Sequence, residues 1–150
     1  MRWLDRFRRS TTEPTLVADP TSEQMDVALT AAKAGDYDTA LALWEPLARA
    51  GHARAQNNIG ACFAEGLGVS SDRPLALKWL TLSADAGDPV GQRNCAAFHM
   101  PGSDAPGSDA DPAQAATLYR LAAQQRDPAP PDILCWLPLA GAVISSVPSP

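Results

Sequence analysis

The chain has 150 residues, enough for one domain with a modest hydrophobic core. A net charge of −5 argues against a general nucleic-acid binder. Three widely spaced cysteines, without a CxxC pair or a histidine cluster, argue against a disulfide scaffold and a zinc site, so we expect reduced thiols that pack in the core.

We expect residues 1–20 to form a basic amphipathic segment and a linker. The apolar and basic side chains of the segment lie on opposite faces of a helical wheel, Trp3, Leu4 and Phe7 against Arg2, Arg6 and Arg9. Such a helix can lie on an anionic membrane surface or dock in the groove of a partner. The alternative is that so short a segment packs against its own chain or frays.

We expect a cytoplasmic location. Polar residues follow the first arginines where a signal peptide would have an apolar stretch. The longest apolar run, Ile133 to Val147, is interrupted by Pro138 and is too short to span a bilayer.

Apolar residues at helical spacing predict three antiparallel helix pairs between residues 21 and 126. Aspartates at expected N-caps and glycines at expected ends set the boundaries. The first helix is expected to open on a capping box of Thr21 and Gln24. The predicted pairs are Ser22–Ala34 with Tyr37–Ala50, Ala53–Glu65 with Arg73–Ala86, and Pro89–His99 with Pro112–Gln125.

The sequence repeats itself along these pairs. Residues 40–58 align with residues 76–94 at a shift of 36, and a further shift of 39 carries Ala76 to Ala115. A helical period of this length indicates stacked helix pairs. We therefore predict an all-α fold, a short α-solenoid of stacked antiparallel helix pairs. We expect residues 127–150 to form a degenerate half-repeat and a proline-rich tail.

One unit, AQNNIGACFAEGLGVSSDRPLALKWLTLSADAGD, carries an ordered set of residues from Ala55 to Asp88. The set is Gly60, Phe63, the loop GLGV, Asp72, Ala76, Trp79, Ala84 and Gly87. It resembles the Sel-one-like repeat family, a relative of the tetratricopeptide repeats, and the resemblance extends over roughly residues 22–141. It implies a helical solenoid that acts as a scaffold or adaptor in protein complexes.

The tryptophans of the predicted helices are expected to fill the core. Trp79 is the expected plug between successive helix pairs, and Trp44 and Tyr119 are expected to pack inward as well. Gly60 is expected to let the partner helix of its pair come close.

No motif for nucleotide binding, zinc proteolysis or serine hydrolysis occurs in the chain. We predict no catalytic, cofactor-binding or metal-binding residue, and a non-catalytic scaffold or adaptor that binds a protein or peptide. Three alternatives stay open. They are a membrane-surface or regulatory accessory protein that docks through the N-terminal segment, a decayed gene copy, and a hydrolase. The hydrolase is kept because some members of the resembled family bind or hydrolyse β-lactams, although the serine–lysine pair and the metal ligands of such chemistry are missing.

Helix spacing also predicts a partner-binding surface. The inward face of the third predicted helix is expected to hold Ala55, Asn58, Ile59, Cys62 and Phe63. Asn57 and Ala61 then point away from the core, and the shift of 36 places Arg93 and Ala97 on the same face of the next unit. In the resembled family these positions line the concave surface. The alternative is a face that is only solvated.

Overall fold

The structure, a computed structural model, describes residues 20–102 and 110–125, and within these ranges it contains six α-helices and no strand. The helices are α2 (Pro20–Lys33), α3 (Tyr37–Arg49), α4 (Ala53–Glu65), α5 (Arg73–Asp85), α6 (Pro89–Phe98) and α7 (Pro112–Gln124). The predicted basic segment and the predicted half-repeat lie outside the described residues. None of the described helices is long and apolar enough to cross a membrane.

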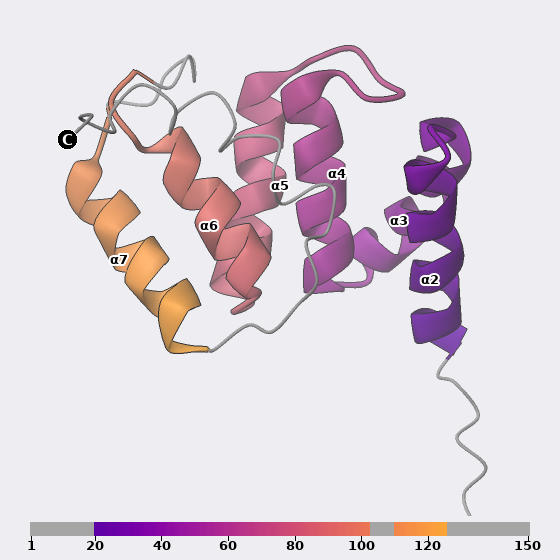
Figure 1. Ribbon diagram of the computed structural model, residues 1–150, viewed down its shortest axis with the longest axis horizontal. Helices are drawn as coiled ribbons and strands as arrows, with labels where there is room; N and C mark the ends of the chain where they lie inside the picture. The colour runs from indigo at the N-terminus through magenta and orange to yellow at the C-terminus, as the bar shows by residue number, and fades with distance from the viewer. Residues whose placement is uncertain (1–19, 103–109, 126–150) are drawn as a thin grey trace, which may run out of the picture.

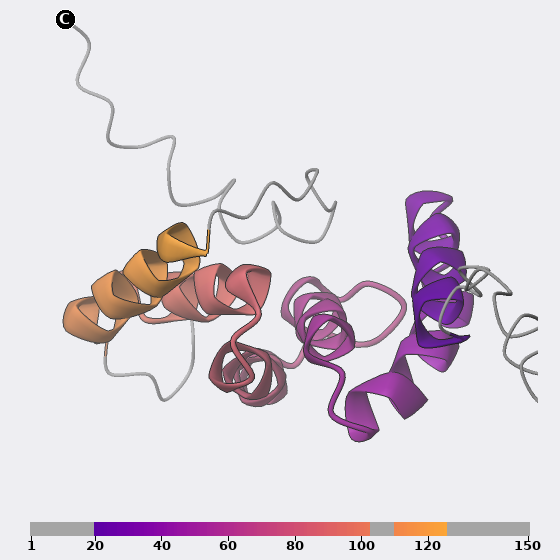
Figure 2. The ribbon, with the colours of Figure 1, turned by 90° about the horizontal axis from the view of Figure 1, so that it is seen from below.

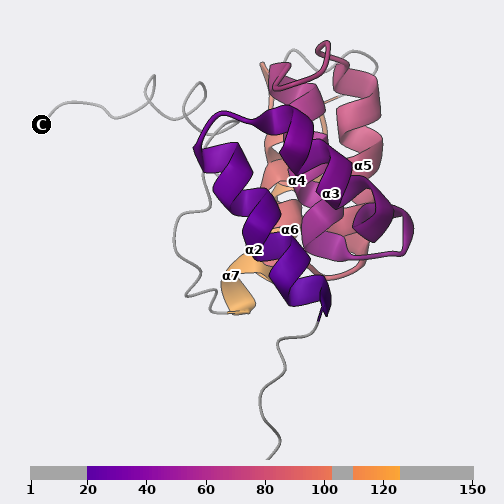
Figure 3. The same ribbon diagram turned by 90° about the vertical axis from the view of Figure 1, so that its right-hand side faces the viewer.

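The helices form antiparallel pairs that follow one another along the molecule (Figure 1). Helix α2 packs on α3, α4 on α5 and α6 on α7, and each pair packs on the next through α3 with α4 and α5 with α6. Figure 2 shows the succession of the pairs from below, and Figure 3 shows α2 beside α3 from the end of the molecule. The predicted α-solenoid of stacked helix pairs is confirmed.

Aspartate caps fix four of the helix starts, as predicted. The side chains of Asp36, Asp72, Asp88 and Asp111 each accept a hydrogen bond from the backbone N–H three residues later, at 2.8–3.1 Å. A cap of this kind is worth about 1 kcal/mol because it satisfies an N–H that has no partner within the helix.

Two helix starts differ from what the sequence suggests. Helix α2 begins at Pro20, ahead of the predicted cap Thr21, and the Gln24 side chain donates to the Leu43 carbonyl of α3 at 2.9 Å. The capping box is therefore wrong. Helix α4 is capped by His52, whose Nδ1 accepts from the Ala55 N–H at 3.3 Å, a role that was not predicted.

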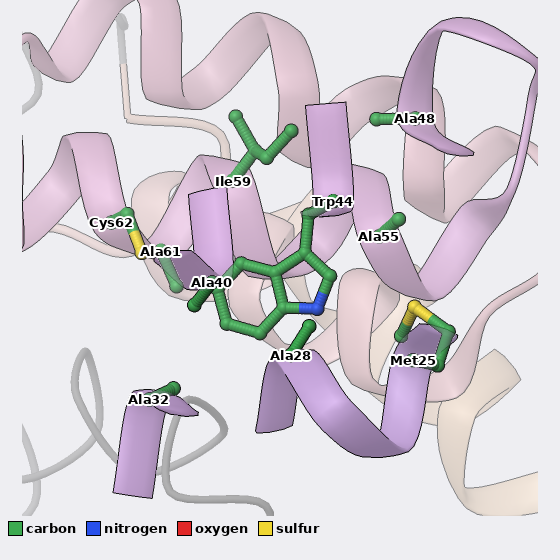
Figure 4. Packing of buried hydrophobic residues seen from close by; sticks show 10 residues of the cluster. All are labelled: Met25, Ala28, Ala32, Ala40, Trp44, Ala48, Ala55, Ile59, Ala61 and Cys62. Atoms are coloured by element: carbon green, nitrogen blue, oxygen red, sulfur yellow. The ribbon is translucent and has the colours of Figure 1, made fainter. Parts of the chain in front are cut away.

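Trp44 is the largest fully buried side chain, with 0% of its surface exposed. Its indole lies close to Met25 and Ala28 of α2 and to Ala40 of its own helix (Figure 4). Trp79 packs against the edge of this cluster and is only partly buried. The expectation that Trp79 is the principal plug is corrected, because it stands between α3 and α5 with one side open, whereas Trp44 is enclosed.

Glycine permits close helix contacts at two places. A Cβ at Gly60 would lie 2.8 Å from Leu80 Cγ of α5, as predicted for this pair. A Cβ at Gly91 would lie 2.6 Å from Ser83 Cβ, which brings α6 equally close to α5. Both contacts are shorter than carbon atoms tolerate, so these helices approach only because the side chain is missing.

Candidate functional site

Glutamine side chains tie each repeat to the one before it. Gln56 Nε2 of α4 donates to the Ala48 carbonyl near the end of α3 at 3.1 Å. Gln92 Nε2 of α6 donates to the Ala84 carbonyl near the end of α5 at 3.5 Å, which is the same joint shifted by 36 residues. Each of these carbonyls also accepts the backbone N–H of the glycine three residues later, so the glutamine adds a second bond at the helix end and helps to fix how successive pairs sit.

An ion pair links the starts of α4 and α6. Arg54 Nε lies 2.9 Å from Asp88 Oδ1, and the Asp88 side chain is only 9% exposed. The second Asp88 oxygen accepts from the Gly91 N–H at 2.8 Å, so one carboxylate both caps α6 and holds it to α4. These bonds between repeats therefore hold the helices in fixed positions, so that a binding surface on them is preformed.

The four residues predicted to contact a partner lie on α4 and α6, which pack against each other. Asn94 Nδ2 of α6 donates to Asn57 Oδ1 of α4 at 2.8 Å. Asn57 is 0% exposed, Ala61 2% and Ala97 8%. Only Arg93 is as much as partly exposed.

This burial corrects the expectation of an open face. The Asn57 amide is engaged inside the protein, since its Nδ2 also donates to Asn58 Oδ1 at 3.2 Å. Ala61 belongs to the core cluster around Trp44. Phe63, predicted to face inward, is partly exposed instead, and helix spacing could not show that the face with Asn57 and Ala61 would be covered. The role of the four residues in binding a partner stays a prediction.

An apolar groove opens on the opposite face of α4, between α3 and α5. Its volume is about 340 Å³. Ile59 and Phe63 of α4 form the floor, and α3 and α5 form the walls. The lining residues are Leu41, Glu45, Arg49, Ile59, Phe63, Val69, Leu75 and Trp79. Sequence reasoning missed this groove, although both walls carry lining residues at helical spacing.

The rim of the groove carries one ion pair. Arg49 Nη2 lies 2.8 Å from Glu45 Oε1, and the two side chains are 71% and 57% exposed. An exposed pair of this kind contributes about 0–1 kcal/mol, so either group can turn to another partner at little cost. The remaining lining side chains are apolar, and two of them, Phe63 and Trp79, are partly exposed aromatics. The groove suits apolar side chains.

All three thiols were predicted to be reduced packing residues, and the two that the structure describes, Cys62 and Cys95, are free and buried, as expected. Burial raises the pKa of the Cys62 thiol to about 12, and burial also raises the pKa of Cys95. A thiol that stays protonated is a poor nucleophile. Cys135 lies outside the described residues. Within the described ranges, no three His, Cys, Asp or Glu side chains are grouped so that they could hold a metal ion.

Comparison with known proteins places the chain by its repeats. No curated protein and no solved structure matches it. The Sel1 repeat matches three consecutive stretches, residues 31–52, 53–88 and 89–127. The second stretch covers the helix pair α4–α5 and the third the pair α6–α7. Because these matches cover well over half of the chain and agree with the stacked pairs, the chain belongs to the Sel1 repeat family.

Proposed function

We propose that the chain is a non-catalytic scaffold or adaptor, and that it holds a short apolar segment of a partner protein in the groove between α3 and α5. Sel1 repeats are commonly protein-interaction modules. The observation that carries the proposal is the open apolar groove, with partly exposed Phe63 and Trp79, on repeats that buried polar bonds hold together.

The size and lining of the groove indicate the partner. Its volume of about 340 Å³ admits a few side chains and excludes a folded domain. Apolar grooves between helices bind amphipathic helices through anchors one turn apart, and aromatic side chains often supply most of the binding energy. Glu45 and Arg49 at the rim can pair with polar groups beside those anchors.

A capture experiment tests this proposal. The tagged full chain is used to isolate partners from native cells, alongside Leu75→Arg, which places a charge in the groove wall. Leu121→Arg is the matched control, because Leu121 is an exposed leucine on α7, away from the groove. We expect the wild type and Leu121→Arg to enrich the same protein, and Leu75→Arg to lose it.

Arg93→Glu in the same experiment tests the predicted face on α4 and α6. Loss of the partner with Arg93→Glu but not with Leu75→Arg would move the site to that face. Enrichment of no protein by the wild type would refute the adaptor function. The membrane-surface alternative concerns residues outside the described ranges, and flotation of the chain with anionic vesicles, with and without residues 1–10, tests it.

A further inference from the structure

Helix α2, where the described chain begins, packs on the helix that forms one wall of the groove. Helix α2 starts at Pro20, and its Gln24 side chain donates to the Leu43 carbonyl of α3 at 2.9 Å. Helix α3 is also one wall of the groove, through Leu41 and its neighbours on the same stripe. Leu43 and Leu41 face opposite sides of α3, so a segment that precedes Pro20 has to pass around this one helix, about 10 Å across, to reach the groove.

Those 19 residues include a segment whose chemistry matches the groove. On a helical wheel, Trp3, Leu4 and Phe7 place two aromatic rings and one aliphatic side chain on a single face. The twelve residues between Phe7 and Pro20 can span up to about 40 Å, which is long enough to pass around α3 to the groove.

The charges are also complementary. The first ten residues carry four arginines and one aspartate, whereas the described residues carry ten acidic and seven basic side chains. Glu45 stands at the rim, held only by an exposed ion pair with Arg49. An arginine that follows the apolar anchors could pair with Glu45 without desolvating a buried charge.

We propose that Trp3, Leu4 and Phe7 dock in the groove of their own chain, with the arginines of the segment toward Glu45 and the solvent. The segment is then an intramolecular ligand, and a tether of this length gives it an effective concentration on the order of millimolar. The segment would then regulate binding, because a partner must displace it from the groove, and this role rests on the proposed function. The partner's own segment is then apolar with basic flanks.

The contact is tested on the purified full chain, without any partner. A photoreactive phenylalanine analogue replaces Leu4, and cross-linked peptides are identified by mass spectrometry in monomers separated from cross-linked dimers. The matched control carries the same analogue at Thr12, in the linker of the same segment. We expect cross-links from position 4, within one chain, to peptides that contain Leu41 or Leu75, and none from position 12.

Two variants make the test specific. Leu75→Arg should abolish the groove cross-links, and Glu45→Lys, an exposed rim change that leaves the core intact, should weaken them more at low salt than at high salt. Circular dichroism confirms that both variants keep their helices. The proposal would be overturned if position 4 gave no cross-links, cross-links to other surfaces, or cross-links only between two chains. It would also be overturned if both variants gave the same yield of groove cross-links as the wild type. The capture of a partner by the groove would remain testable in each case.

Discussion

Replacing Trp44 by alanine removes the side chain that the first helix pair and α4 enclose. A buried tryptophan takes about 150–250 Å² out of water. At roughly 25 cal/mol per Å² this corresponds to about 4–6 kcal/mol, and partial collapse of the cavity brings measured losses to about 3–5 kcal/mol. The total free energy of unfolding of a domain of this size is about 5–15 kcal/mol, so we expect Trp44→Ala to leave the fold barely stable.

Two further variants test whether the loss of stability comes from the full burial of Trp44 and not from the removal of any tryptophan. Trp79 is only partly buried at the edge of the same cluster, so Trp79→Ala should lose about 1–2 kcal/mol. Trp44→Phe keeps most of the packing and removes an indole N–H that has no acceptor among the described residues. An unmatched buried donor costs about 1–3 kcal/mol, so this variant should stay within about 1 kcal/mol of the wild type.

Urea unfolding followed by circular dichroism measures all three free energies. Equal losses for the two alanine variants, or a loss below about 1 kcal/mol for Trp44→Ala, would refute the assignment of Trp44 as the principal core residue.

Three further predictions concern the contacts between repeats and the buried thiols. Gly91→Ala should lower the free energy of unfolding by about 1–3 kcal/mol, because its Cβ would collide with Ser83, and an unchanged melting temperature would contradict the close contact. A double-mutant cycle of Arg54→Ala with Asp88→Asn should give a coupling of about 1–2 kcal/mol that favours the pair, and additive losses would show that the ion pair couples nothing. The pKa of Cys62 is about 12 in the folded chain against 9.0 for a free thiol, so the folded state binds more protons above pH 9. Stability should therefore be full below pH 9 and fall as the pH rises toward 12, and Cys62→Ala should flatten that fall in urea titrations. An equal slope in both proteins would exclude this thiol as its source.

Local signals were sufficient for the helices. The predicted bounds of the third helix, Ala53–Glu65, are those of α4, and the second helix ends within one residue of its predicted end at Ala50. A cap such as Asp72 acts on the N–H three residues away, so its effect is contained in the sequence around it. The repeat period then fixed the pairing of the helices and their stacking.

Surfaces could not be predicted in the same way. Whether Asn57 is open or buried depends on the approach of α6, and the bond from Asn94 spans 37 residues of sequence. The groove arises because Trp79 stands at its edge without filling it, and no periodicity distinguishes that arrangement from full burial. Helical spacing tells which residues share a face. It does not tell how close the neighbouring helix comes.

The glutamine joints also bear on how such a chain can grow. Each joint uses a side chain from one unit and a carbonyl eight residues earlier, at the end of the preceding unit. If residues 53–88 were duplicated and inserted after Asp88, the copied Gln56 would meet the Ala84 carbonyl at the same separation. The inserted unit would bring its own glutamine donor, and its last helix would offer the matching carbonyl to the unit that follows. A gene that copies this stretch thus lengthens the protein without any new interface having to evolve.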